Sequence, residues 1–273
     1  MKKKDGHVHT PFCPHGTADS LEMYIEKALN IGLEEITFTE HAPLPDGFSD
    51  PVPDNDSAMS RRLLNDYISQ LLTVKEKYSK DIKVNIGFEI DYIEGFEQET
   101  QAFLDEYSKY VDDAVLSVHF LKIGDQYYCV DFHESAFPHM IEAAGSLKSL
   151  HKKYYETMLA AVKSNLGPYK PKRLGHLTLI NKFQKRFPAD FDLKNMQYDL
   201  LLAIKEQNME LDFNVAGLRK DLCGAIYLDQ WMINEAKKQN IPLVYGSDAH
   251  SAKDVGAHYS LFNEALFKDS YAE

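Results

Sequence analysis

Hydrophobic and polar positions follow two different rhythms along the chain. Short apolar segments typical of strands are separated by longer segments with apolar residues at helical spacing. The strand-type segments are 5–9, 34–40, 82–91, 113–120, 172–179, 209–215 and 242–248, and the helical ones are 20–32, 57–80, 97–111, 139–165, 195–208 and 229–240. This alternation favours an α/β fold with a mostly parallel sheet and helices outside it, either closed into a barrel or doubly wound.

Two segments have clear local signals. Residues 20–32 begin with Ser20, a good N-cap, and end with Gly32, so they predict a helix. Residues 42–57 contain four prolines and several Asp, Asn, Gly and Ser residues, so they predict a loop. A loop this long inside a compact domain is usually functional and often serves as an active-site lid.

The reactive residues lie where the strand segments end. In both architectures the functional face is formed by the carboxyl ends of the strands. The imidazoles and carboxylates at these ends are His7, His9, Glu40, His41, Glu89, Asp91, His119, His176, Asp248 and His250. With His15, seven of the eleven histidines lie at or just after predicted strand ends. We therefore expect these side chains to meet at one face.

The spacing of His7 and His9 indicates metal binding. Side chains two residues apart on a strand point to the same face, and two imidazoles held together repel when protonated but can share a divalent cation. Asp248 and His250 repeat the spacing, and these ligand types suit zinc, manganese or iron.

Each of these features also has a plainer interpretation. Asp248 suits a helix N-cap, Glu89 and Asp91 suit solvated turn residues, and His119 suits a core histidine bonded to the backbone. Taken together, the residues favour a shared metal site over coincidence. The remaining histidines are interpreted as surface or packing residues: His133, His139, His151 and His258.

Composition narrows the class of protein. The 273 residues, 44% of them hydrophobic, suit one large domain or two small ones. A net charge of −12 argues against a nucleic-acid partner, because phosphate backbones attract basic surfaces. The three cysteines form no CxxC pair, no apolar run is long enough to span a membrane, and the first lysines precede no hydrophobic segment. We expect a cytosolic protein without a membrane partner, and a monomer or homodimer.

Six motifs carry a resemblance to a known family. HVHTPFCPHG, FTEHAP, GFEIDY, LSVHF, LGHL and GSDAH, in this order, resemble the motifs of the polymerase and histidinol phosphatase (PHP) superfamily over residues 5 to about 260. The length, the TEHAP loop and the GHLTLINKF segment are similar to those of its stand-alone histidinol-phosphate phosphatases. The resemblance implies one domain over 1–273, a distorted (β/α)7 TIM-like barrel with the loop at 42–57 inserted.

The resemblance also implies a centre of three divalent metal ions, zinc, iron or manganese. His7, His9, Glu89 and Asp248 would hold one ion, Glu89 would bridge to a second that His119 and His176 complete, and His15, His41 and His250 would hold a third. The implied reaction is hydrolysis of L-histidinol phosphate, a small phosphomonoester, by a metal-activated hydroxide that attacks phosphorus. Glu89, Asp248 and His250 are the implied catalytic residues.

A phosphate substrate also calls for basic residues. Lys182 and Arg219 fall where the resemblance places phosphate-contacting cations, and Arg186 is the substitute for Lys182. Arginine is frequent in the family at the Lys182 position, and lysine keeps the charge without the bidentate fork. The alternative for each is an ordinary solvated charge.

Two other functions fit the same motifs. One is a PHP-type phosphoesterase that acts on another small phosphomonoester or on a nucleic-acid end, and the acidic charge argues against the latter. The other is a non-catalytic metal-binding module, against which the intact ligand set argues.

Overall fold

The computed structural model describes residues 2–267, and seven parallel strands form its centre. They are β1 (Lys4–Val8), β2 (Glu35–His41), β3 (Lys83–Asp91), β4 (Asp113–Ser117), β7 (Arg173–Leu174), β8 (Glu210–Asn214) and β9 (Leu243–Gly246). They pair in the order β1-β2-β3-β4-β7-β8-β9. A parallel bridge between Val8 and Ala249 and a hydrogen bond of 2.9 Å from the His9 amide to the Ala249 carbonyl join the two edges. The predicted (β/α)7 barrel is therefore confirmed.

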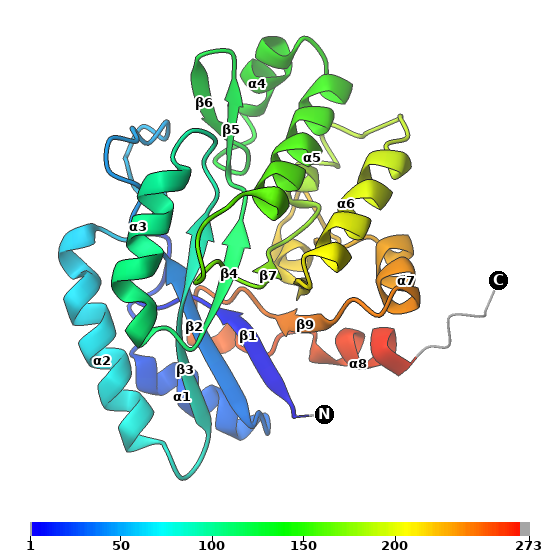
Figure 1. Ribbon diagram of the computed structural model, residues 1–273. Coiled ribbons are helices and arrows are strands. Elements are labelled where there is room, and N and C mark those ends of the chain that lie inside the picture. The colour runs from blue at the N-terminus through cyan, green and yellow to red at the C-terminus, as the bar shows by residue number, and fades with distance from the viewer. Residues whose placement is uncertain (1, 268–273) are drawn as a thin grey trace.

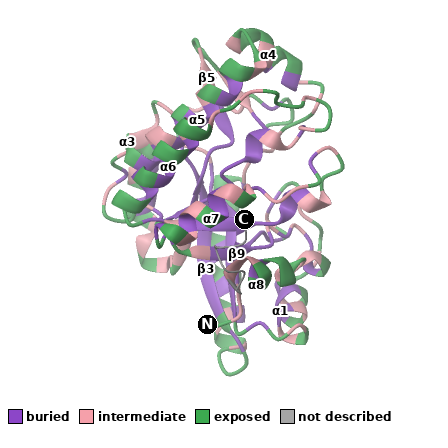
Figure 2. Ribbon diagram, turned by 90° about the vertical axis from the view of Figure 1, so that its right-hand side faces the viewer, coloured by how far each residue is buried: buried purple, intermediate pink, exposed green. Residues whose placement is uncertain are grey.

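Helices connect the strands and cover the outside of the barrel (Figure 1). They are α1 (Leu21–Asn30), α2 (Leu64–Lys77), α3 (Glu97–Tyr107), α4 (Phe137–Ala144), α5 (Leu147–Lys163), α6 (Lys194–Glu206), α7 (Gln230–Lys238) and α8 (Tyr259–Phe267). A parallel crossover places its helix on the sheet face, so both sides of each strand become buried. Figure 2 shows this burial in the strands, with the exposed residues on the outer helix faces. None of the helices within residues 2–267 has the length and apolar character that a membrane span needs.

Three segments differ from the sequence-based expectation. The strand expected over 172–179 pairs only at β7, because the chain turns after Gly175, where a side chain would meet the Ser117 hydroxyl at 2.2 Å. The helix expected over 139–165 is divided into α4 and α5 by Gly145, whose φ of +83° ends the first helix. The antiparallel hairpin of β5 (Phe120–Ile123) and β6 (Gln126–Cys129) was not predicted.

The register of the barrel places reactive side chains side by side. In the pairing of β2 with β3, His41 stands opposite Glu89, the last residue but two of β3. Phe88 and Ile90, on either side of Glu89, belong to the apolar core around the strands. Successive side chains of a strand point to opposite faces, so Glu89 points into the barrel. The carboxyl ends of the strands thus form one polar mouth.

Candidate metal centre

Glu89 lies at the middle of a group of imidazoles. Its Oε2 lies 3.4 Å from the Nε2 of His7, 3.4 Å from the Nε2 of His9 and 3.2 Å from the Nδ1 of His41. Its Oε1 lies 3.0 Å from the Nε2 of His176. These residues come from four different strand ends, so the barrel closure brings them together. One buried carboxylate therefore faces several imidazoles at once.

Two further predicted ligands complete this group. His119, which follows β4, lies with its Nε2 3.8 Å from Glu89 Oε1. Asp248, which follows β9, lies with its Oδ1 3.2 Å from His9 Nε2. Asp248 has a φ of +51°, a backbone conformation that non-glycine residues rarely adopt. Hydrogen bonds from its amide to the His7 carbonyl (2.7 Å) and from Arg219 to its carbonyl (3.1 Å) hold this strained residue.

A second layer of carboxylates orients the imidazoles. Asp212 lies 2.7 Å from His7 Nδ1, Glu40 lies 3.2 Å from His9 Nδ1, and Asp91 lies 2.8 Å from His119 Nδ1. A carboxylate at Nδ1 holds the proton there, so the lone pair of Nε2 is directed into the mouth, as in metal sites. Glu40 and Asp91 were noted as strand-end residues. Asp212 was missed, and the available signal was a carboxylate within the apolar strand MELDFNV.

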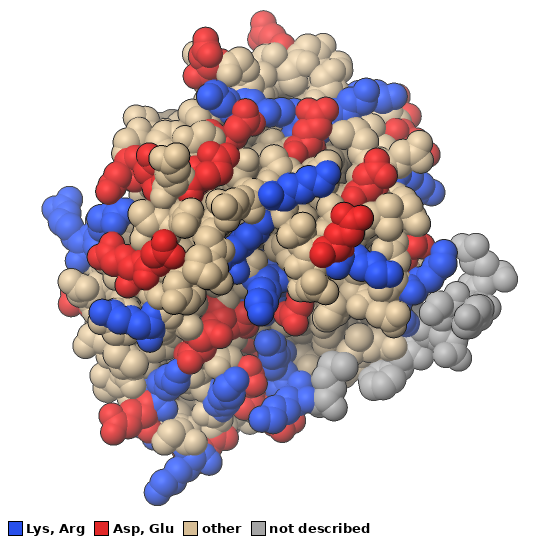
Figure 3. Space-filling model, viewed as in Figure 1, with Lys and Arg blue, Asp and Glu red and all other residues tan. Residues whose placement is uncertain are grey.

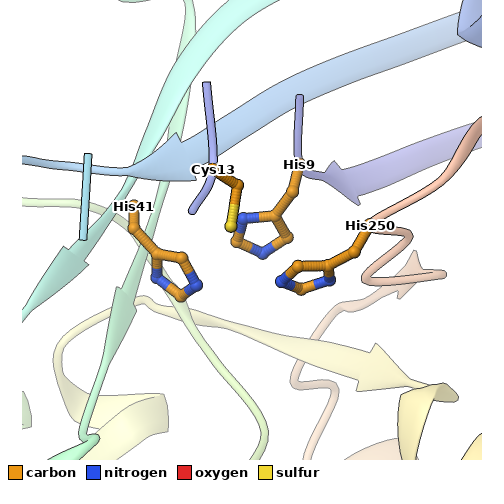
Figure 4. Close-up of side chains that lie close together, drawn as sticks. All are labelled: His9, Cys13, His41 and His250. Carbon is orange, nitrogen blue, oxygen red and sulfur yellow. The ribbon is translucent and has the colours of Figure 1, made fainter. Parts of the chain in front are cut away.

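The third predicted ligand set is brought together in part. His41 and His250 lie beside His9 and Cys13, and one donor atom from each of these four residues falls within 4.8 Å of the others (Figure 4). His15 lies outside this group at the rim, with its side chain 47% exposed and its Nε2 3.6 Å from Asp56. Its role as a ligand stays a prediction. Cys13 was interpreted from the sequence as an ordinary thiol, since it is part of no metal-type spacing.

The charges of the cluster are in conflict without an added cation. Burial opposes ionisation of Glu89, but the attraction of His7, His119 and His41 outweighs it and lowers the pKa of Glu89 well below its ordinary value. Burial is likewise outweighed at His7, whose pKa is raised to about 10 by Glu89, Asp212 and Asp248. Burial is not outweighed at His250, where burial and then the charge of His9 lower the pKa to about 3. Neighbouring imidazoles cannot all be charged.

The donor atoms fit divalent metal ions. Three buried imidazole nitrogens that face Glu89 have no hydrogen-bond partner in the described part of the chain: His7 Nε2, His9 Nε2 and His41 Nδ1. Metal–ligand bonds of about 2.1 Å in a tetrahedral site place ligand atoms about 3.4 Å apart. The measured separations from Glu89 Oε2 to His7, His9 and His41 are 3.2–3.4 Å. Two overlapping sets share Glu89, namely His7–His9–Glu89 and Glu89–His119–His176.

The cluster forms the floor of a cavity of about 230 Å³. The walls combine apolar side chains with charged ones: Val52, Leu179, Phe132, Tyr227, Asp131, Lys182 and Lys220. Burial alone would raise the pKa of Asp131, but the Lys182 ammonium 3.0 Å away lowers it below its ordinary value. The cavity therefore offers both cations and apolar surface to a small molecule.

The three basic residues predicted for phosphate lie in different places. Lys182 lines the cavity and pairs with Asp131. Arg219 does not line it, but its Nη1 is buried without a partner while its Nη2 donates to the Ser247 carbonyl at 2.7 Å. Arg186 lies outside the cavity lining and pairs with Glu134. Lys220 lines the cavity and was not predicted, because it follows Arg219 directly and gives no separate signal.

Comparisons with known proteins agree with this geometry. The PHP domain model matches residues 5–216, and a PHP-associated model matches residues 233–270. The histidinol-phosphatase of Bacillus subtilis is 49% identical over 97% of this chain and 99% of its own length. A candidate histidinol phosphatase from Listeria monocytogenes superposes with a TM-score of 0.91 at 36% identity, covering 95% of this chain and all of its own.

A third protein shares the fold at lower identity. The histidinol phosphate phosphatase of Lactococcus lactis, crystallised with zinc, L-histidinol and phosphate, has a TM-score of 0.72 at 22% identity. The match covers 97% of this chain and 94% of that one.

Proposed function

The chain belongs to the PHP domain family, and we propose that it is a metal-dependent histidinol-phosphatase, which converts L-histidinol phosphate to L-histidinol and inorganic phosphate in histidine biosynthesis. The observation that carries this proposal is the Glu89 cluster at the floor of the cavity. Unpaired imidazole nitrogens converge there at ligand distances beneath walls that bear lysines. A relative that shares 49% of the sequence over nearly the whole chain is a histidinol-phosphatase.

Three divalent ions, zinc, iron or manganese, are the proposed complement of the cluster. His7, His9, Glu89 and Asp248 would hold the first ion, and Glu89, His119 and His176 the second. His41 and His250 would hold the third with His15, which would have to turn inward from Asp56. Bound divalent cations lower the pKa of water from 15.7 to about 7 and neutralise charge on phosphoryl oxygens.

The chain's own residues bind the substrate and handle its protons. Lys182 and Lys220 line the cavity and would attract the phosphate. Arg219 does not line it, and its predicted contact with the phosphate would need a small movement of its unpartnered Nη1 toward the cavity. The carboxylate of Asp248 is ionised, since His7 and His9 overcome the effect of burial and lower its pKa. We assign to this carboxylate the acceptance of a proton from the attacking water and the delivery of that proton to the leaving oxygen of the substrate. His250, with its Nδ1 3.5 Å from Asp248 Oδ1, lies beside this carboxylate.

The domain organisation and the cellular compartment of the protein are also part of the proposal. The PHP and PHP-associated segments contribute to one barrel, because β9 lies in the second segment and pairs with β8. We therefore treat 1–273 as one catalytic domain. The cysteines in the described residues, Cys13, Cys129 and Cys223, are all free, which suits the reducing cytosol. The partner is a small phosphomonoester.

Phosphate release from a panel of substrates tests this function. The panel contains histidinol phosphate, sugar and nucleotide monoesters, and a short single-stranded oligonucleotide with a terminal phosphate. The proposal predicts that kcat/KM for histidinol phosphate exceeds that for every other member. Equal turnover of all monoesters would reduce the protein to a general phosphatase, and preference for the oligonucleotide would replace the substrate altogether.

A further inference from the structure

We propose that Val52 is a specificity-determining residue, which packs against the flat ring of the substrate's leaving group, and that Phe48 and Asp50 hold it in place. The inference rests on the proposed function for the identity of the leaving group, a histidinol side chain with an imidazole ring. All three residues lie in the predicted loop, residues 42–57.

Val52 has unusual surroundings for a loop residue. It is 3% exposed, whereas its neighbours Pro51, Pro53, Asp54 and Asn55 are exposed. Burial of a valine in the middle of a polar loop usually means that the side chain joins the hydrophobic core. Val52 is not part of the main core cluster, and it lines the cavity above the Glu89 cluster instead. The small part of its apolar side chain that stays exposed therefore faces the cavity and not the core.

Asp50 fixes the loop around Val52. Its Oδ1 accepts hydrogen bonds from the Val52 amide at 2.9 Å and from the Ser57 hydroxyl at 2.9 Å, and its Oδ2 accepts one from the Ser57 amide at 3.0 Å. These bonds close residues 50–57 into a small ring whose two cavity-lining members are Val52 and Ser57. Because the side chain of Asp50 closes this ring, Val52 is held in position before a substrate binds.

Phe48 anchors this ring to the barrel. Its side chain lies edge-on between three aromatic rings, with centroid distances of 5.3 Å to Phe96, 5.1 Å to Phe120 and 5.0 Å to Tyr127. Phe120 is 1% exposed and directly follows His119. Edge-to-face aromatic pairs stabilise packing beyond the effect of their buried area. In Figure 1 the loop accordingly lies near the β5–β6 hairpin at the carboxyl-end face.

Val52 shares the cavity lining with other apolar side chains. Leu179 and Phe132 line the cavity as well, together with the lysines of its walls and the cluster at its floor. A phosphomonoester would thus place its phosphate near the cluster and the lysines and its ring against apolar side chains. Removing one or two methyl groups from such a contact is worth about 1–3 kcal/mol, or 10- to 200-fold in kcat/KM.

The test compares substrates with and without a ring on Val52→Ala. The ring-bearing substrates are histidinol phosphate and p-nitrophenyl phosphate, and the ringless one is O-phosphoethanolamine, which keeps the phosphate and the amine. We expect kcat/KM for both ring-bearing esters to fall about 10-fold through KM, with kcat within twofold, and no change for phosphoethanolamine. Phe48→Ala should give the same pattern, and Phe48→Leu should restore most of the wild-type value.

Controls separate this inference from loss of structure and from the proposed function. Val74→Ala, which removes a buried valine from α2 far from the cavity, should lower the melting temperature without changing the substrate ratios. Equal losses on ringed and ringless esters in Val52→Ala, or no loss on either, would overturn the role of Val52. If the wild-type protein fails on histidinol phosphate, the proposed function falls, and the ratio of p-nitrophenyl phosphate to phosphoethanolamine still decides the role of Val52.

Discussion

Both ends of the barrel bury charged side chains, but they balance them differently. At the amino end Arg173, 1% exposed, donates to Asp113 at 2.9 Å, and Lys4 lies 3.5 Å from the same carboxylate. Glu35 accepts a hydrogen bond from Asn85 at 2.7 Å. Cations and anions at this end are therefore paired with one another. The other two side-chain nitrogens of Arg173 are buried without a partner, but they are donors and have no lone pair for a cation.

At the carboxyl end the same barrel gathers imidazoles whose unpartnered nitrogens face one another across Glu89. No rearrangement of protons among them satisfies all of these atoms, since neighbouring imidazoles that are all charged repel one another. A cation from outside the chain resolves the conflict. Buried charge alone therefore does not indicate a site, whereas the convergence of lone pairs on one point does. Substitutions at the two ends should accordingly have different effects.

The largest effect is expected from Glu89→Gln at the carboxyl end. The substitution keeps the size of the side chain but removes the charge that faces four imidazoles within 3.4 Å. Bound metal should fall by at least one ion per chain, and kcat/KM should fall about 1,000-fold or more, because several kcal/mol of charge stabilisation is lost. Elemental analysis and phosphate release measure both. Wild-type metal content in this variant would disprove the assignment of Glu89.

Asp113→Asn at the amino end should lower the stability of the fold and leave the metal centre unchanged. It leaves the buried Arg173 guanidinium without its carboxylate, so the free energy of unfolding should fall by about 3 kcal/mol. Metal content and kcat/KM should remain at wild-type values. Urea unfolding followed by circular dichroism gives the first quantity. A loss of metal in this variant would show that the two ends of the barrel are coupled.

Arg219→Ala tests whether Arg219 contributes to phosphate binding at the carboxyl end. Loss of one charged hydrogen bond to phosphate costs about 1.5–3 kcal/mol, so kcat/KM should fall roughly 10- to 150-fold, chiefly through KM. Arg186→Ala is the matched control, since Arg186 pairs with Glu134 away from the cavity and its removal should change nothing. Unchanged kcat/KM in Arg219→Ala would remove this residue from the site. An equal fall in kcat would mean that it acts only by holding the Asp248 carbonyl.

The smallest effect concerns a buried histidine outside both ends. His151 on α5 is 5% exposed, and burial lowers its pKa to about 4 from an ordinary 6.5. The folded protein therefore favours the neutral form, and its stability is complete above pH 6.5 and falls as the pH drops toward 4. Between pH 7.5 and 5.5 the loss should be about 1.4 kcal/mol.

Substitution tests whether His151 carries this pH dependence. His151→Leu should abolish the loss, which urea unfolding at the two pH values measures. His139→Leu, at an exposed position on α4, should leave it intact. If the free energy of unfolding of His151→Leu still falls between the two pH values as in the wild type, the pH dependence belongs to other groups, the carboxyl-end cluster included.

The sequence predicted the barrel well because its strands are buried on both faces. Periodicity identified all seven strands. It overextended chiefly the strand that the turn after Gly175 cuts short, and also the strand expected over 113–120, which ends at Ser117. The β5–β6 hairpin was missed because β5 follows closely on β4 with no turn signal before Phe120.

The net charge of the chain could not show how acidic and basic side chains are arranged on the surface. Acidic and basic side chains are in fact interspersed on the face in Figure 3.

The site was predictable where chemistry follows position along a strand. The structure brings together His7, His9, Glu89, His119 and His176, which all lie near the end of a strand or one or two residues beyond it. The placement of side chains beyond the strands was not predictable. Whether His15 or Cys13 faces the cluster depends on the turn at residues 10–16, and whether Arg219 or Lys220 faces the cavity depends on a short helical turn. Pattern along the chain does not specify such orientations.

Anomalous scattering from crystals of the purified protein, with data collected at the zinc, iron and manganese absorption edges, would locate bound ions in the cluster. We expect strong peaks between Glu89 and the imidazoles of His7, His9, His41, His119 and His176, and their loss together with phosphatase activity after chelation. A crystal with these side chains in place, no anomalous peak among them, and full activity in the same preparation would contradict the proposed metal centre.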